Sequence, residues 1–124
     1  MSRSARFAVF TLALAGAGAM VLRASDVNNY DADLQYQIAT VLFEESRYGE
    51  AMEAYLRAAK STSDPALVLR SKKGRVRSAL RIAEFGVARE EADTLRSQAP
   101  RDPEALTLHG DSLWAAGLFD ESDA

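Results

Sequence analysis

Residues 36–60, YQIATVLFEESRYGEAMEAYLRAAK, decide the fold of this chain. Apolar residues recur there at steps of three and four on both sides of the polar break Ser46–Gly49, which is the spacing of two amphipathic helices joined by a turn. The first set is Tyr36, Ile38, Ala39, Leu42 and Phe43, and the second is Ala51, Met52, Tyr55, Leu56, Ala58 and Ala59. We therefore expect a helical hairpin that ends before the polar stretch 61–65.

The same pattern of helix, break and helix returns twice along the chain. The second pass has Leu69, Val76, Ala79, Leu80 and Ala83 before a break at Phe85-Gly86, and Val87, Ala88, Ala92 and Leu95 after it. The third pass begins at Pro103 and has Ala105, Leu106, Leu108, Leu113 and Trp114, after which Gly117 is expected to end the helix before Phe119. Because no useful length of strand-like alternation appears, we predict an all-α domain.

The aromatic residues that follow the breaks set the period of the repeat. They are Tyr48, Phe85 and Phe119, separated by 37 and then 34 residues. A helix–turn–helix unit with a period near 34 residues is typical of tetratricopeptide repeat (TPR) arrays, and the chain resembles that family. The resemblance is carried by Ala39, Leu42, Tyr48, Ala51, Tyr55 and Ala58, by Phe85, Ala88, Leu95 and Pro100, and by Leu106, Gly110, Leu113, Gly117, Phe119 and Glu121. It implies a solenoid of about two and a half hairpins, and the separate pattern of residues 1–24 predicts a signal helix before it.

The resemblance also implies where the units lie. A linker at 25–31 precedes unit 1 (32–64), unit 2 (65–102) and an incomplete unit 3 (103–124). The first helix of unit 2 diverges, since Lys72, Arg75 and Val76 stand where the family has large apolar residues and a small one. The chain stops about one turn into the helix that should close unit 3. We therefore expect these 124 residues to be the front of a longer protein.

The first 24 residues have the pattern of an export signal. Arg3 and Arg6 precede sixteen uncharged residues at 7–22, which become small toward their end and offer cleavage after Ala19 or Ala24. At ~1.5 Å per residue the run spans roughly 24 Å, less than the ~30 Å hydrocarbon core of a bilayer. We predict a cleaved signal peptide and a protein of the periplasm or cell envelope. The alternative is that residues 7–22 are retained and anchor the protein in the inner membrane.

Composition argues against several classes of function. The chain has no cysteine and a single histidine, His109, which excludes disulfides and thiolate zinc sites and speaks against a histidine metal site. Three of the 15 basic residues lie in 1–24, so the remainder carries 12 basic and 18 acidic residues and is poorly suited to nucleic acid. Ser112, His109 and Asp111 are neighbours on one helix and cannot converge as a catalytic triad. We predict no enzymatic activity, no cofactor and no metal.

In TPR proteins the first helix of each hairpin lines a concave groove that binds peptides or partner helices. By position, the resemblance implies a groove lined by Tyr36, Thr40, Phe43 and Glu44 in unit 1, by Arg70, Lys73, Arg77 and Arg81 in unit 2, and by Thr107, Asp111, Trp114 and Ala115 in unit 3. The four cations share one helical stripe by spacing alone. They suit an acidic segment or a C-terminal carboxylate, although a solvated helix face has the same pattern. The aromatic residues are either anchors for a ligand or packing between hairpins.

The sequence therefore predicts an exported protein–protein interaction scaffold that binds a partner protein or peptide in the groove of a TPR array. The partner is expected to carry an acidic segment, nucleic acid is not expected, and membrane contact depends on retention of the N-terminal segment. The alternative is the N-terminal TPR module of a longer exported, hydrolase-like enzyme whose catalytic part is absent here. A third hypothesis is an assembly in which arrays contact one another through the incomplete hairpin.

Overall fold

The computed structural model describes residues 28–122, with side chains as far as Gly117. A first helix is described from residue 28 to residue 44 and is followed by α2 (Tyr48–Lys60), α3 (Pro65–Arg81), α4 (Phe85–Gln98) and α5 (Pro103–Ser122). No strand occurs among residues 28–122, so the predicted all-α class is confirmed. The predicted signal or anchor at 1–24 lies outside the described residues. Within them, no helix combines the length and apolar character needed to cross a membrane.

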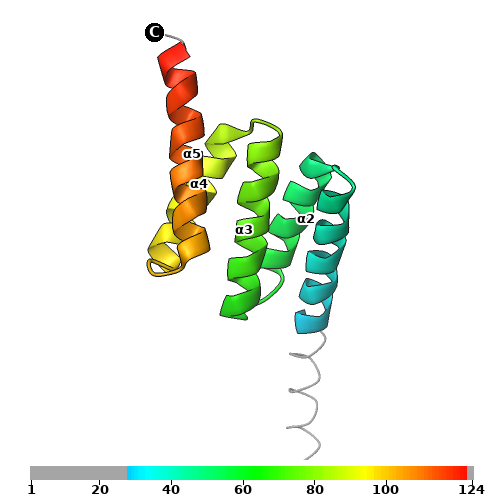
Figure 1. Cartoon of the computed structure of the whole chain (residues 1–124). Helices are drawn as coiled ribbons and strands as arrows, with labels where there is room; N and C mark the ends of the chain where they lie inside the picture. Colours follow the sequence, from blue (N-terminus) through cyan, green and yellow to red (C-terminus); the bar gives the residue numbers. More distant parts are fainter. Residues whose placement is uncertain (1–27, 123–124) are drawn as a thin grey trace, which may run out of the picture.

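The helices form antiparallel neighbours in chain order. Figure 1 shows helix 28–44, α3 and α5 running in one direction, with α2 and α4 returning between them. α3 packs against α2, α4 and α5, and α4 also packs against α5. Helix 28–44 contacts α2 through the ring pairs Tyr36–Tyr55 and Phe43–Tyr48. Each helix thus contacts the next along the chain, and α3 also contacts the helix two places further on.

The two hairpin turns have the same backbone geometry. After helix 28–44, the amide of Ser46 donates to the carbonyl of Phe43 (3.0 Å) and that of Arg47 to Leu42 (2.9 Å). After α3, the amides of Ala83 and Glu84 make the equivalent bonds, to residues 80 and 79, at 3.4 and 2.9 Å. Ser46 and Ala83 both have positive φ, 62° and 59°. This pair of bonds is the Schellman motif, which usually has glycine at the left-handed position.

Side-chain and proline signals mark the starts of α3 and α5. The Asp64 carboxylate accepts from the amide of Ala66 (3.1 Å), and Pro65 is the first residue of α3. α5 begins at Pro103, and the carboxylate of the preceding residue, Asp102, accepts a hydrogen bond from the third residue of the helix, Ala105 (3.0 Å). Each aspartate satisfies an otherwise free amide, and each proline supplies the φ of a first helical residue.

Two apolar clusters form the core, one for each complete hairpin. The first consists of Ala39, Ala51, Ala54 and Tyr55, with Tyr36, Leu42 and Phe43 packed against it. The second consists of Val76, Ala79, Ala88, Ala92, Leu95, Ala105 and Leu108. The fully buried alanines let helix backbones approach closely.

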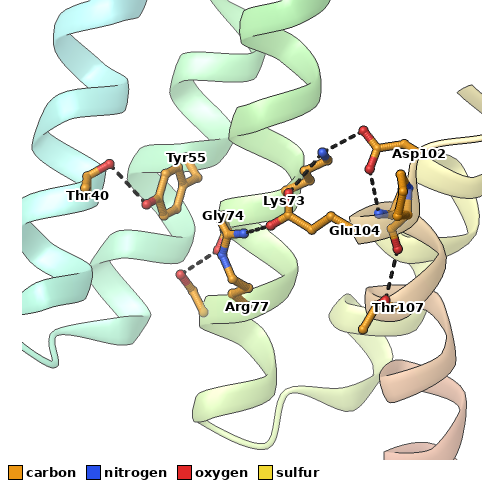
Figure 2. Close-up of polar contacts among 11 residues, drawn as sticks. Thr40, Tyr55, Lys73, Gly74, Arg77, Asp102, Glu104 and Thr107 are labelled. Atoms are coloured by element: carbon orange, nitrogen blue, oxygen red, sulfur yellow. Dashed lines mark hydrogen bonds and ion pairs between the residues drawn. The ribbon is translucent and has the colours of Figure 1, made fainter. Parts of the chain in front are cut away.

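Tyr55 and Gly74 form a close contact between the two hairpins. The Tyr55 side chain is only 4% exposed, and a Cβ placed on Gly74 would lie 2.5 Å from its ring. The Tyr55 hydroxyl is 3.3 Å from Thr40 Oγ1, which itself donates to the Tyr36 carbonyl, so Tyr55 is the donor to Thr40 (Figure 2). Burial raises the pKa of the Tyr55 hydroxyl, which keeps it protonated for this role. The absence of a side chain at Gly74 thus makes room for the ring.

The divergent residues of α3 form an ionic contact with α4. Arg75 Nη1 lies 2.6 Å from Glu91 Oε2, and Lys72 Nζ lies 3.8 Å from Glu91 Oε1. Glu91 is buried, whereas Val76 keeps an apolar place in the core. One carboxylate with two cations therefore takes the place of the large apolar residues expected from the family pattern.

The expected end of a helix at Gly117 is wrong, because α5 continues through Gly117 to Ser122. A single glycine inside a helix costs about 1 kcal/mol relative to alanine, which weakens a helix without ending it. In addition, residues 118–122 contain no proline that would end the helix.

Candidate partner-binding face

Helix 28–44, α3 and α5 carry all the residues predicted to line a groove. The three helices run in the same direction, and α3 lies between the other two in Figure 1. We call the side of the molecule that carries these residues the first-helix face. Its residues fall into an aromatic part on helix 28–44, a basic stripe on α3 and a mostly exposed part on α5.

The aromatic residues of helix 28–44 pack against α2 as well as bordering this face. Tyr36 meets Tyr55 edge-on with ring centroids 5.7 Å apart, and Phe43 meets Tyr48 in the same way at 5.1 Å. Tyr36 and Phe43 are half-buried, so each keeps part of its ring accessible. Both therefore stabilise the first hairpin and are still able to contact a ligand.

Arg70 and Arg81, at opposite ends of α3, lie over tyrosine rings. The Arg70 Cζ is 5.1 Å from the centroid of Tyr36, and the Arg81 Cζ is 5.7 Å from that of Tyr48. Both arginines are exposed, and neither has a carboxylate at ion-pair distance among the described side chains. A guanidinium above a ring keeps its in-plane N–H groups free to bind a carboxylate in a bidentate manner.

Lys73 and Arg77, the middle pair of the stripe, are engaged by α5 (Figure 2). Lys73 Nζ lies 2.8 Å from Asp102 Oδ2 and 3.1 Å from Glu104 Oε2, and Arg77 bonds to the other oxygen of Glu104. Lys73 is 9% exposed. The stripe therefore has two neutralised cations at its centre and two available ones at its ends.

The charges of this ionic contact shift the pKa values of its members. Burial of Lys73 acts to lower its pKa, but the hydrogen bonds to Asp102 and Glu104 outweigh it, so the pKa lies above its ordinary value. The hydrogen bond from Lys73 and the one from the Ala105 amide hold the pKa of Asp102 below its ordinary value. Both groups are thus charged near neutral pH, and their attraction holds α3 to α5.

The predicted residues of α5 do not join the arginines. Thr107 donates to the carbonyl of Pro103 (2.9 Å), Asp111 is exposed, and Trp114 is 70% exposed. Ala115 is half-buried, and Glu44 on the first helix is exposed. Of the predicted groove residues, the structure places Arg70 of α3 against Tyr36 of helix 28–44.

Three residues of this region were not predicted from the sequence. Tyr48 lies under the guanidinium of Arg81, and Asp102 and Glu104 neutralise the middle of the stripe. Asp102 directly precedes α5 and Glu104 lies in its first turn, where acidic residues are common because they favour the helix dipole. Acidic residues beside Pro103 indicate a helix start, and the sequence carries no signal that places them against α3.

Other titratable residues take structural roles. His109 Nε2 lies 2.8 Å from Asp93 Oδ1 of α4, and the Ser112 hydroxyl donates to the Leu108 carbonyl (2.7 Å). The hydroxyl of Ser112 is thus not directed at His109. Among the described residues, no group of three or more histidine, cysteine or acidic side chains is placed to hold a metal ion.

Comparison of the chain with protein-family models, curated proteins and solved structures gave no match. The resemblance to TPR arrays therefore depends on the chain's own residues alone.

Proposed function

We propose that this protein is an exported, TPR-type scaffold that binds an acidic segment of a partner protein on the first-helix face. The observation that carries the proposal is the pair Arg70 and Arg81, each placed over a tyrosine ring and neither neutralised within the described residues. Export rests on the signal pattern of residues 1–24.

Two features of the backbone support a repeat array. The turns at Ser46 and Ala83 have the same hydrogen bonds at an offset of 37 residues, which is also the spacing of Tyr48 and Phe85. The contact of α3 with α5 joins the first helices of successive hairpins, the kind of neighbour contact from which solenoids are built.

The positions of the two arginines specify the ligand further. Arg81 lies eleven positions after Arg70 on α3, which is roughly 16 Å at ~1.5 Å per residue. An extended peptide covers that distance in about five residues at ~3.3 Å each. We therefore expect two acidic side chains about five positions apart, or one such side chain and a C-terminal carboxylate. The neutralised Lys73 and Arg77 lie between the two points of contact.

The test uses a synthetic peptide with two glutamates five positions apart in a neutral sequence, and a lysine version of the same peptide. Binding is measured by fluorescence anisotropy with the full chain. The variant Arg70→Gln/Arg81→Gln is compared with Arg89→Gln/Arg96→Gln, which removes two exposed arginines from α4 instead. We expect the glutamate peptide alone to bind, with at least about tenfold weaker binding for the first variant, since charged hydrogen bonds contribute ~1.5–3 kcal/mol each.

Two outcomes would contradict the proposal. Equal losses in the two variants would mean that only overall charge matters. An absence of binding by the unaltered chain would remove the acidic segment as the ligand. A photo-crosslinking residue at Thr107, on the same face, then identifies native partners in envelope extracts, with the same residue at Arg96 as the control site.

A further inference from the structure

One side of α5 is apolar and partly exposed in the described part of the chain. Leu106 and Leu113 are 45% and 43% exposed. Gly110 and Gly117 alternate with these leucines in the order Leu106, Gly110, Leu113, Gly117. The steps of four, three and four residues place all four on one side of the helix. A Cβ placed on either glycine would meet nothing within 4 Å. We call these four residues the α5 stripe.

Up to Gly117, the other sides of α5 carry the core residues and an exposed polar face. Ala105, Leu108 and Ser112 are buried on another side of the helix, and the first two belong to the core cluster built with α3 and α4. Asp111 lies about 100° around the helix from Gly110, so its charge is at the border of the α5 stripe. Trp114, one turn after Gly110, extends the exposed apolar surface at its edge.

The order of large and small residues makes the stripe complementary to itself. When two copies of α5 pack antiparallel with Gly110 of one opposite Leu113 of the other, Leu106 falls opposite Gly117. The same pairs then recur after the two copies are exchanged, as a two-fold interface requires. Each leucine meets a glycine, which allows close approach and interdigitation without two large residues colliding.

We propose that two copies of this chain associate through the α5 stripe with their α5 helices antiparallel. A second exposed apolar side in the described residues, on helix 28–44, is formed by Tyr30, Leu34, Ile38 and Val41. It contains only large residues, so it offers no small position to receive Leu106 or Leu113. A second copy of α5 offers two.

Cysteine cross-linking tests the register, because the natural chain has no cysteine. Mixing full chains that carry Gly110→Cys and Leu113→Cys is expected to give a disulfide-linked pair, as is mixing Leu106→Cys with Gly117→Cys. Leu106→Cys alone is expected not to cross-link, since its two copies lie roughly 16 Å apart along the helices, beyond the reach of a disulfide. Efficient linkage of Leu106→Cys to itself, or to Leu34→Cys on helix 28–44, would overturn the proposal.

A size exchange tests the packing independently. Gly110→Leu places two leucines opposite each other, and Leu113→Gly leaves a gap, so each is expected to raise the dissociation constant at least about tenfold. The double variant exchanges the sizes across the interface and is expected to return to within about threefold of the natural chain.

Sedimentation equilibrium provides the dissociation constants, and the emission of Trp114, the only tryptophan, follows the same transition. Circular dichroism checks that each variant folds, which the open space at Gly110 favours. A monomer at all concentrations, or a double variant as weak as the single ones, would show that this interface does not form.

Discussion

Gly74→Ala is expected to destabilise the protein, although alanine is the better helix former. The new Cβ would lie 2.5 Å from Cε1 and Cζ of Tyr55, about 1 Å inside the usual carbon–carbon distance. The ring has little freedom to move, because it packs edge-on against Tyr36 and its hydroxyl bonds to Thr40. Overpacking of this kind costs about 1–3 kcal/mol, and the gain in helix propensity is at most ~1 kcal/mol. We expect a net loss of about 1–2 kcal/mol in the free energy of unfolding.

Urea denaturation followed by circular dichroism measures this difference. Gly86→Ala is the matched control, since its Cβ would meet nothing within 4 Å, and it is expected to be neutral or slightly stabilising. Tyr55→Leu shortens the side chain that collides, so adding Gly74→Ala to it should cost much less than in the natural background. A Gly74→Ala protein as stable as the natural one would refute the close contact between α2 and α3.

Three further predictions concern the turns and the ionic contacts. Ala83→Gly is expected to raise the free energy of unfolding by about 0.5–1 kcal/mol, because glycine adopts positive φ without the steric cost that alanine bears there. A decrease in the free energy of unfolding, measured by urea titration, would contradict this. The pKa of Asp102 is lowered in the folded state, so its contribution to stability is present above about pH 4 and is lost as the pH falls below that value. Asp102→Asn should therefore reduce the loss of thermal stability between neutral and acidic pH, and an unchanged pH profile would exclude this role. Glu91→Gln leaves Arg75 without its buried anion and is expected to lower the free energy of unfolding by about 1–3 kcal/mol. An unchanged stability in thermal denaturation would show that water replaces the carboxylate.

The sequence predicted the helical class because its signals are local. Apolar steps of three and four are set within a few residues, as in Tyr36–Phe43, and the helix described over 28–44 includes that segment. Pro65 and Pro103, which begin helices, are local signals of the same kind. The error at Gly117 is also local in origin, since a glycine can either end a helix or remain inside it.

The partners of the basic stripe could not be predicted in the same way. Lys73 and Asp102 are 29 residues apart, and their contact depends on how α5 is placed against α3. Spacing along α3 identifies a row of four cations but does not show which of them are neutralised. Only the packed helices separate Arg70 and Arg81 from the middle pair.

The division of the core into two alanine-rich clusters has a consequence for local motion. The hairpin formed by helix 28–44 and α2 holds a cluster of four buried residues, three of them alanine, whereas the second cluster extends over α3, α4 and α5. Local opening requires least energy where little apolar surface is buried. Amide hydrogens of the first hairpin should therefore exchange with solvent faster than those of α3 and α4. The tyrosines that support Arg70 and Arg81 belong to this hairpin, so any ligand that binds both arginines would also slow its opening.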